Sequence, residues 1–153
     1  VFLLQGVLQW IVSLPVQLAM LRPGAASLGA WDALGVAIFA TGLVFETVGD
    51  AQLAAFKADP ANEGRVMDRG LWRYTRHPNY FGDFLVWWGL FAVALATPWG
   101  WIGAIGPGLM TFLLLRVSGV ALLERGMARR RPAYEAYRRR TNAFFPGPPR
   151  EEA

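Results

Sequence analysis

The sequence contains no cysteine and a single histidine, His77. The lack of cysteine excludes a disulfide framework, thiolate metal sites and a cysteine nucleophile. One histidine cannot form a poly-histidine cluster, so we expect no metal site. Charged residues are also scarce, at 17% of the chain, whereas a soluble domain usually carries about a quarter. This composition argues against a disordered chain, a fibrous repeat and an ordinary soluble α/β domain.

Apolar residues are abundant instead, at 54% of the 153 residues. Four apolar stretches are long enough to span a bilayer as helices, namely 1–21, 31–56, 80–96 and 99–123. We therefore predict one membrane domain over 1–153, an all-α polytopic transmembrane helix bundle with a cytoplasmic tail over 124–153. A short helix is expected in that tail near 132–140. The absent initiator methionine and the immediate start in a helix predict an N-terminally truncated fragment.

The basic residues fall in two regions that an even number of crossings separates. Five lie in 57–76 and eight in 125–150, out of 15 in the chain. The positive-inside rule places both regions, and both ends of this chain, in the cytoplasm. Tryptophans near the predicted span ends fit an interfacial belt: Trp31, Trp72, Trp99 and Trp101. Arginine beside four spans also makes nucleic acid an unsuitable partner, and the bilayer is the expected one.

Ionisable side chains within the spans mark a candidate pocket. Glu46 and Asp50 lie four residues apart on one helix face. Asp83, Arg116 and Glu124 fall at the same cytoplasmic depth of the bundle. Buried ion pairs, such as Arg116 with Asp50 or Asp83, are the alternative to a polar pocket. Either way, Arg116 must face a carboxylate or an anionic ligand, because an unpaired charge in the bilayer is costly.

Two further patterns concern packing. A polar stripe recurs every four residues in the first segment, at Gln5, Gln9, Ser13 and Gln17. It either bonds to helices outside this chain or lines a substrate cavity. The last segment opens with small residues and a proline, at Gly100, Gly103, Gly106, Pro107 and Gly108. They predict close helix approach and a proline kink.

The block from Gly70 to Asp83 carries the clearest chemistry. Pro78 is suited to the first turn of a helix, whose free N–H groups form an anion site. Arg73, Arg76 and His77 add positive charge there, and Asn79, Tyr80 and Asp83 add directional hydrogen-bonding groups. The block suits a ligand with phosphates and sugar hydroxyls. A loop that binds lipid headgroups is the alternative.

A second block runs from Glu124 to Pro146. It contains two arginine triplets, 129–131 and 138–140, around Tyr134 and Tyr137, which share one face of a short helix. Arginine binds phosphate bidentately, and aromatic rings stack on bases. A topology signal with lipid contacts also accounts for several of these arginines.

At these two blocks the sequence resembles the C-terminal part of the steroid 5-alpha-reductase-like integral membrane proteins. It is most similar to a bacterial branch known as a domain of unknown function. The Arg-His-x-Asn-Tyr-x-Gly-Asp pattern at 76–83 is also similar to that of the sterol C14 reductases. The resemblance implies an NADPH site, a bacterial inner-membrane location and cofactor contacts at Asp50, Tyr74, Arg76, His77, Asn79, Tyr80, Asp83, Arg116 and Tyr137. Glu124 joins this set as a candidate from the polar pocket.

The implied activity is NADPH-dependent reduction of a lipid-like or steroid-like enone. The catalytic carboxylate and tyrosine of the steroid reductases lie on N-terminal helices outside this chain, so no catalytic residue is assigned. Glu46 stands where those enzymes have asparagine, and Glu124 where they have tyrosine.

Two alternatives stay open. Isoprenylcysteine and phospholipid methyltransferases, which bind S-adenosylmethionine, share the pattern at Arg76, His77, Pro78, Tyr80 and Gly82. Asn79 and Asp83 favour the reductases, and Glu124 lacks the second glutamate typical of the methyltransferases. A non-enzymatic lipid-binding membrane module is the other alternative.

Overall fold

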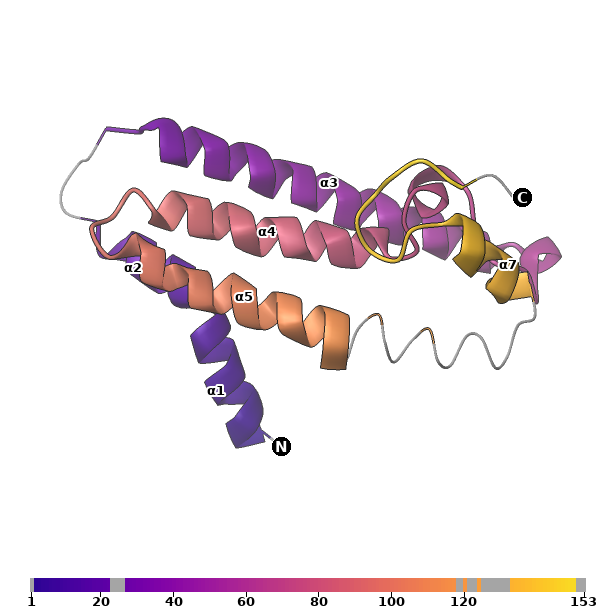
Figure 1. Cartoon of the computed structure of the whole chain (residues 1–153), viewed down its shortest axis with the longest axis horizontal. Coiled ribbons are helices and arrows are strands. Elements are labelled where there is room, and N and C mark those ends of the chain that lie inside the picture. Colours follow the sequence, from indigo (N-terminus) through magenta and orange to yellow (C-terminus); the bar gives the residue numbers. More distant parts are fainter. Residues whose placement is uncertain (1, 23–26, 118–119, 121–123, 125–132, 151–153) are drawn as a thin grey trace. The chain divides into compact units, whose positions relative to one another are not determined.

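The computed structural model describes residues 2–22, 27–117, 120, 124 and 133–150. These residues form helices and connecting segments, with one isolated β-bridge between Thr75 and Asn142. The α-helices are α1 (Phe2–Val12), α2 (Leu14–Met20), α3 (Ala30–Ala58), α4 (Pro78–Ala94), α5 (Ile105–Phe112) and α7 (Ala133–Arg140). Shorter helical segments are η1 (Pro60–Asn62), η2 (Gly70–Arg73), η3 (Gly100–Ala104) and the π-helical η4 (Leu113–Val117). Figure 1 traces them along the chain.

Two helical stretches are long and apolar enough to cross a membrane, Ala30–Ala58 and Gly100–Val117. The α1–α2 pair makes a third if it is counted as one bent span. The remaining expected span corresponds to α4, whose 17 residues stand at the lower limit of the about 17–25 that crossing requires. The protein is thus an all-α membrane helix bundle, as predicted, and the count of four spans stays a prediction.

The first apolar segment is two helices, which corrects the single helix expected over 1–21. α1 and α2 meet at Ser13 with a bend of 51°. Pro15 sits in the first turn of α2, where its missing N–H is tolerated. Within the bend, Gln17 Nε2 donates to Ser13 Oγ at 2.8 Å and to the Trp10 carbonyl at 2.9 Å. Part of the polar stripe therefore bonds to its own segment.

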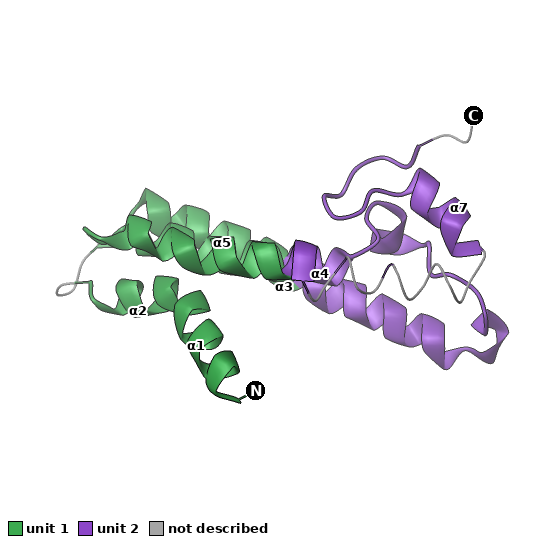
Figure 2. Cartoon of the chain, turned by 60° about the horizontal axis from the view of Figure 1, so that its bottom comes forward, with its two compact units in different colours: residues 1–43, 83–113 green, residues 44–82, 114–153 purple. Residues whose placement is uncertain are grey.

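The chain divides into two compact units, coloured separately in Figure 2. Unit 1 comprises residues 1–43 and 83–113. In it, glycines mark the helix contacts. A Cβ on Gly106 would lie 2.5 Å from the Val12 carbonyl oxygen, and one on Gly35 would lie 2.7 Å from the Gly89 carbonyl oxygen. The close approach predicted from Gly106 is confirmed. Two residues before Pro107 the 3-10 helix η3 changes to the α-helix α5. The kink expected at Pro107 stays a prediction.

Unit 2 comprises residues 44–82 and 114–153. In it, α4 begins at Pro78 and α7 occupies the tail, both as predicted. The extended segment after α7 pairs with the residues before α4, because Arg76 N donates to the Asn142 carbonyl at 2.9 Å. Thr75 Oγ1 adds a 2.7 Å bond to the Phe144 carbonyl. These contacts hold the start of α4 against the tail.

Trp72 corrects one expectation about the membrane interface. Its side chain is buried, and its indole Nε1 donates to the Gly49 carbonyl at 3.0 Å. An interfacial tryptophan would keep its N–H near water. Trp72 therefore belongs to the interior of unit 2, whereas Trp31, Trp99 and Trp101 are exposed as an interfacial belt requires.

Candidate functional site

Unit 2 contains a cavity of about 620 Å³. This volume lies within the range of about 300–1,000 Å³ that is typical of small-molecule sites. The end of α3, the loop after it, η2, the start of α4 and α7 form its walls. The lining side chains are both apolar and polar: Leu53, Phe56, Lys57, Asp59, Asn62, Glu63, Val66, Met67, Trp72, Arg76, His77, Asn79, Tyr80, Tyr134 and Tyr137.

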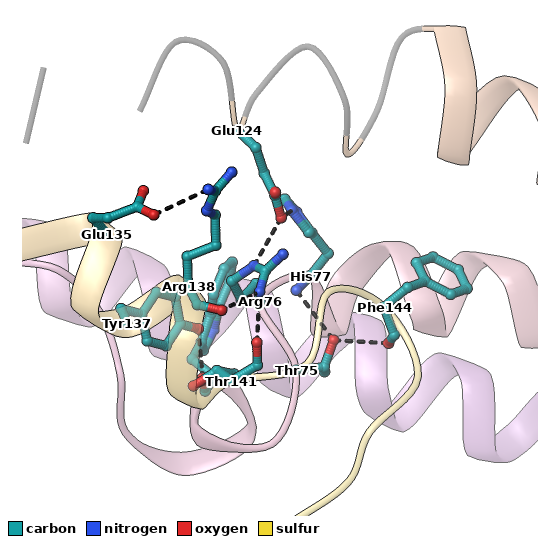
Figure 3. A network of polar contacts seen from close by, with 10 residues as sticks. Thr75, Arg76, His77, Glu124, Glu135, Tyr137, Arg138, Thr141 and Phe144 are labelled. Carbon is teal, nitrogen blue, oxygen red and sulfur yellow. Dashed lines mark hydrogen bonds and ion pairs between the residues drawn. The ribbon is translucent and has the colours of Figure 1, made fainter. Parts of the chain in front are cut away.

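Arg76 is the centre of a buried hydrogen-bond network at the cavity wall (Figure 3). Its Nε donates to Glu124 Oε1 at 2.8 Å. Its Nη1 donates to the carbonyls of Arg138 at 2.8 Å and Thr141 at 2.5 Å. Because these partners lie 48 to 65 residues away in sequence, Arg76 ties the tail to the start of α4.

His77 shares the same carboxylate. Its Nε2 lies 3.3 Å from Glu124 Oε1, and its ring stacks on Tyr80 with centroids 5.6 Å apart and an interplanar angle of 6°. Burial by itself raises the pKa of the Glu124 carboxyl, but hydrogen bonds from His77 and Arg76, together with the Arg76 charge, hold that pKa below its ordinary value. Glu124 is therefore a carboxylate at neutral pH.

Two tyrosines of α7 complete this wall, and both are 3% exposed. The Tyr137 hydroxyl donates to the Trp72 carbonyl at 2.5 Å. Burial, with the nearby negative Glu124, raises the pKa of Tyr134 to about 12. Burial also raises the pKa of Tyr137. Both hydroxyls therefore stay protonated at neutral pH. At its end, α7 is held by an ion pair between Arg140 and Asp68.

Asn79 follows Pro78 in the first turn of α4. Its Nδ2 donates to Asp50 Oδ1 at 2.9 Å, and its Oδ1 accepts from the Tyr80 backbone N–H at 3.0 Å. The side chain is thus oriented by α3 on one side and by its own helix on the other. One face of Asn79 still lines the cavity.

The structure brings half of the predicted site residues to the cavity wall: Arg76, His77, Asn79, Tyr80 and Tyr137. Asp50 and Glu124 contact members of this set. Tyr74 lies outside the lining with an exposed side chain, and its carbonyl accepts from Gly147 N–H. Asp83 lies on α4 in unit 1. Arg116 is exposed in η4, and no ion pair to it occurs in the described parts of the chain.

Several lining residues were not anticipated. Lys57, Asp59 and Glu63 come from the end of α3 and the loop after it, and Val66 and Met67 follow in the same loop. This loop contains no recognisable motif, and the sequence predicts only a topology signal from its basic residues. Two local signals of defined turns occur there. Asp59 accepts from the Ala61 N–H and caps η1, which begins at Pro60, and Gly64 has φ +77°. In the described part of the chain, no group of three metal-binding side chains occurs.

The fold defines a helical membrane protein, and its unit 2 contains a cavity of the size that small-molecule sites have. The chain belongs to the family described as "Protein of unknown function (DUF1295)", whose model matches residues 1–141.

Two relatives were found among curated proteins. An uncharacterized protein of Schizosaccharomyces pombe is 25% identical over 163 aligned residues, which cover 90% of this chain and 45% of that protein. A protein of Ustilaginoidea virens named "Probable O-methyltransferase ustE" is 42% identical over 62 residues, which cover 40% of this chain and 22% of that protein. The chain spans less than half the length of both relatives. No solved structure matches it significantly.

Proposed function

We propose that the protein is an NADPH-dependent membrane reductase of the steroid 5-alpha-reductase-like type, which reduces a lipid-like or steroid-like enone. The observation that carries the proposal is the cavity itself. It lies at the N-terminal turn of α4, where the helix dipole favours anions. The cavity combines the Asn79 amide at that turn with two buried tyrosines and the stacked His77–Tyr80 pair.

The residues present fit a dinucleotide in three ways. Lys57 is exposed on the cavity lining and is available to a phosphate. The aromatic faces suit flat rings, which stack on tyrosine and histidine. The apolar part of the lining, including Leu53, Phe56 and Val66, would shield part of a bound ligand from water.

Bound NADPH would supply the hydride, and the protein would supply orientation and electrostatics. Asn79, held by Asp50, offers its amide to the ligand in a fixed direction. Arg76 acts differently, because its hydrogen bonds to Glu124 and to two carbonyls already occupy it. We assign Arg76 the role of fixing the wall that the tyrosines of α7 form.

Isothermal titration of the full-length protein in detergent tests the proposal, with NADPH, NADH and S-adenosylmethionine as ligands. Tyr80→Ala should weaken NADPH binding about tenfold, because a stacking ring is worth about 1–3 kcal/mol per base. Tyr74→Ala is the matched control, since Tyr74 lies outside the cavity lining, and its affinity should stay at the wild-type value. Absence of NADPH binding, or equal losses in both variants, would reject the cofactor site.

A methyltransferase is the second candidate. The similarity to the Ustilaginoidea virens protein favours it. The Arg76-His77-Pro78 block is compatible with both enzyme classes and does not separate them. The same titration separates the two, because a methyltransferase binds S-adenosylmethionine in preference to NADPH. Transfer of a labelled methyl group, without oxidation of NADPH by an enone, would decide for this candidate.

A further inference from the structure

His77 is the only histidine of the chain, and its two ring nitrogens have different surroundings. Nε2 lies 3.3 Å from Glu124 Oε1. Nδ1 makes no hydrogen bond with any residue the structure describes, although the side chain is only 7% exposed. No buried polar side-chain atom in the described residues lacks a partner. Nδ1 is therefore accessible to solvent, and His77 is one of the residues that line the cavity.

Glu124 determines which nitrogen carries the proton in the neutral ring. A carboxylate only accepts hydrogen bonds, so the nitrogen that faces it must donate. Arg76 Nε donates to the same oxygen at 2.8 Å, which fixes the carboxylate in place. A neutral imidazole has one donor and one acceptor, and the partner of the first nitrogen sets the tautomer. With Nε2–H on Glu124, the lone pair is left on Nδ1.

We propose that Glu124 is a positioning residue that holds His77 as the Nε2–H tautomer, so that Nδ1 meets the cavity ligand as a hydrogen-bond acceptor. The inference rests on the proposed function for the identity of the ligand. The ligand must present a hydrogen-bond donor to Nδ1, such as a ribose hydroxyl or the carboxamide N–H of a nicotinamide. A phosphate oxygen, which accepts, does not suit Nδ1. His77 would thus recognise a sugar or amide part of the cofactor, in contrast to the cationic role that the sequence predicts.

Nitrogen-15 NMR of histidine-labelled full-length protein tests the proposal directly, because the one histidine of this chain can be identified by comparison with His77→Gln. In the neutral ring without ligand we expect a protonated Nε2 and an unprotonated Nδ1. A proton on Nδ1, with Nε2 bare, would overturn the proposal. So would an equal mixture of the two tautomers.

Three variants separate positioning from a general structural role. Glu124→Gln keeps an oxygen acceptor and should keep the Nε2–H tautomer. Glu124→Leu removes the acceptor and should shift the ring toward a mixture of tautomers. The control is Glu135→Gln, since Glu135 is half-exposed and pairs with Arg138 on α7; its spectrum should match the wild type. An unchanged tautomer in Glu124→Leu would contradict the proposal. If that variant does not fold, the tautomer of His77 in the wild-type spectrum still tests the proposal.

Ligand titrations give the second readout. NADPH should shift the Nδ1 resonance while Nε2 stays protonated, and its affinity should fall about fivefold in Glu124→Leu, the value of about one hydrogen bond. Inorganic phosphate should leave Nδ1 unprotonated; protonation of both nitrogens by phosphate would overturn the acceptor role. The reductase function and the positioning role of Glu124 can be rejected independently of each other. An Nε2–H tautomer without NADPH binding rejects the reductase and leaves the role of Glu124, whereas NADPH binding to an Nδ1–H ring rejects the role of Glu124 alone.

Discussion

Arg76 shows how the environment of a residue determines its role. Its sequence context, beside His77 and before Pro78, predicts a cation that faces an anionic ligand. In the structure its side chain is 8% exposed and is bonded to Glu124 and to two carbonyls of the tail. A buried charge needs such partners, because its desolvation is otherwise uncompensated. The same residue that lines the cavity is therefore a structural tie.

This role predicts a large loss of stability in Arg76→Ala. Removing the guanidinium leaves Glu124 with only its His77 contact among the described residues and takes the donor away from the carbonyls of Arg138 and Thr141. The free energy of unfolding should therefore fall by about 3–5 kcal/mol. Arg73→Ala is the control, because Arg73 is exposed in η2, and its change should stay within about 0.5 kcal/mol. Denaturant unfolding in detergent measures both. Equal stabilities of the two variants would show that the network contributes nothing to folding.

At the scale of the elements, glycine spacing decides where helices meet. Gly106 and Gly108 both lie in the first half of α5, two residues apart. A Cβ at Gly106 would lie 2.5 Å from the Val12 carbonyl and 2.9 Å from Pro15 Cδ, whereas a Cβ at Gly108 would meet nothing within 4 Å. Only Gly106 therefore requires the absence of a side chain. The pair of Gly35 and Gly89 makes the corresponding contact between α3 and α4.

Gly106→Ala and Gly108→Ala should consequently change stability in opposite directions. Alanine at 108 replaces glycine in an open helical position, which stabilises a helix by about 0.5–1 kcal/mol. Alanine at 106 forces α5 away from α1 and α2, and we expect a loss of about 1–3 kcal/mol, as for other overpacked sites. Thermal unfolding of the two variants in detergent measures the difference. A gain of stability in both would show that α5 moves away at no cost.

For the whole molecule, the two basic regions predict how the chain is inserted. Thirteen of the 15 basic residues lie in 57–76 and 125–150, which the four-span arrangement places on one side. Glu63 and Ala143 are exposed representatives of these regions, and Leu28 represents the connection between the first two segments. The chain has no native cysteine, so each position can be labelled alone.

An impermeant thiol reagent added to intact cells should therefore label Leu28→Cys and leave Glu63→Cys and Ala143→Cys unlabelled. After the cells are permeabilised, all three should react. The physical reason is the excess of arginine, which is retained on the cytoplasmic side during insertion. Labelling of position 63 or 143 in intact cells would break the predicted topology, and labelling of only one of these two would require an odd number of crossings between them.

Much of the fold follows from short-range patterns. Pro78 begins α4, the polar segment after the arginine triplet at 129–131 forms α7, and the small residues Gly103 and Gly106 line a helix contact. Each depends on interactions within one turn or on the hydropathy of one segment, which the sequence displays directly. The bend at Ser13 is a local effect of the same kind, and Pro15 marks it.

The candidate site, unlike these elements, depends on contacts between residues that lie far apart in the sequence. The block at 76–80 and the tyrosines of α7 can be singled out from the sequence, but their partners cannot. Glu124 meets Arg76 across 48 residues, Tyr137 meets Trp72 across 65, and Arg140 meets Asp68 across 72. The loop at 59–67 lines the cavity, although its sequence contains no recognisable motif. The sequence by itself determined the apolar helices, the start of α4 and the tail helix, because propensity and hydropathy act locally. Only the tertiary structure decided that Arg76 is bound within the wall, that Trp72 is buried and that Glu124 faces His77, because burial and ion pairing depend on which distant segments meet.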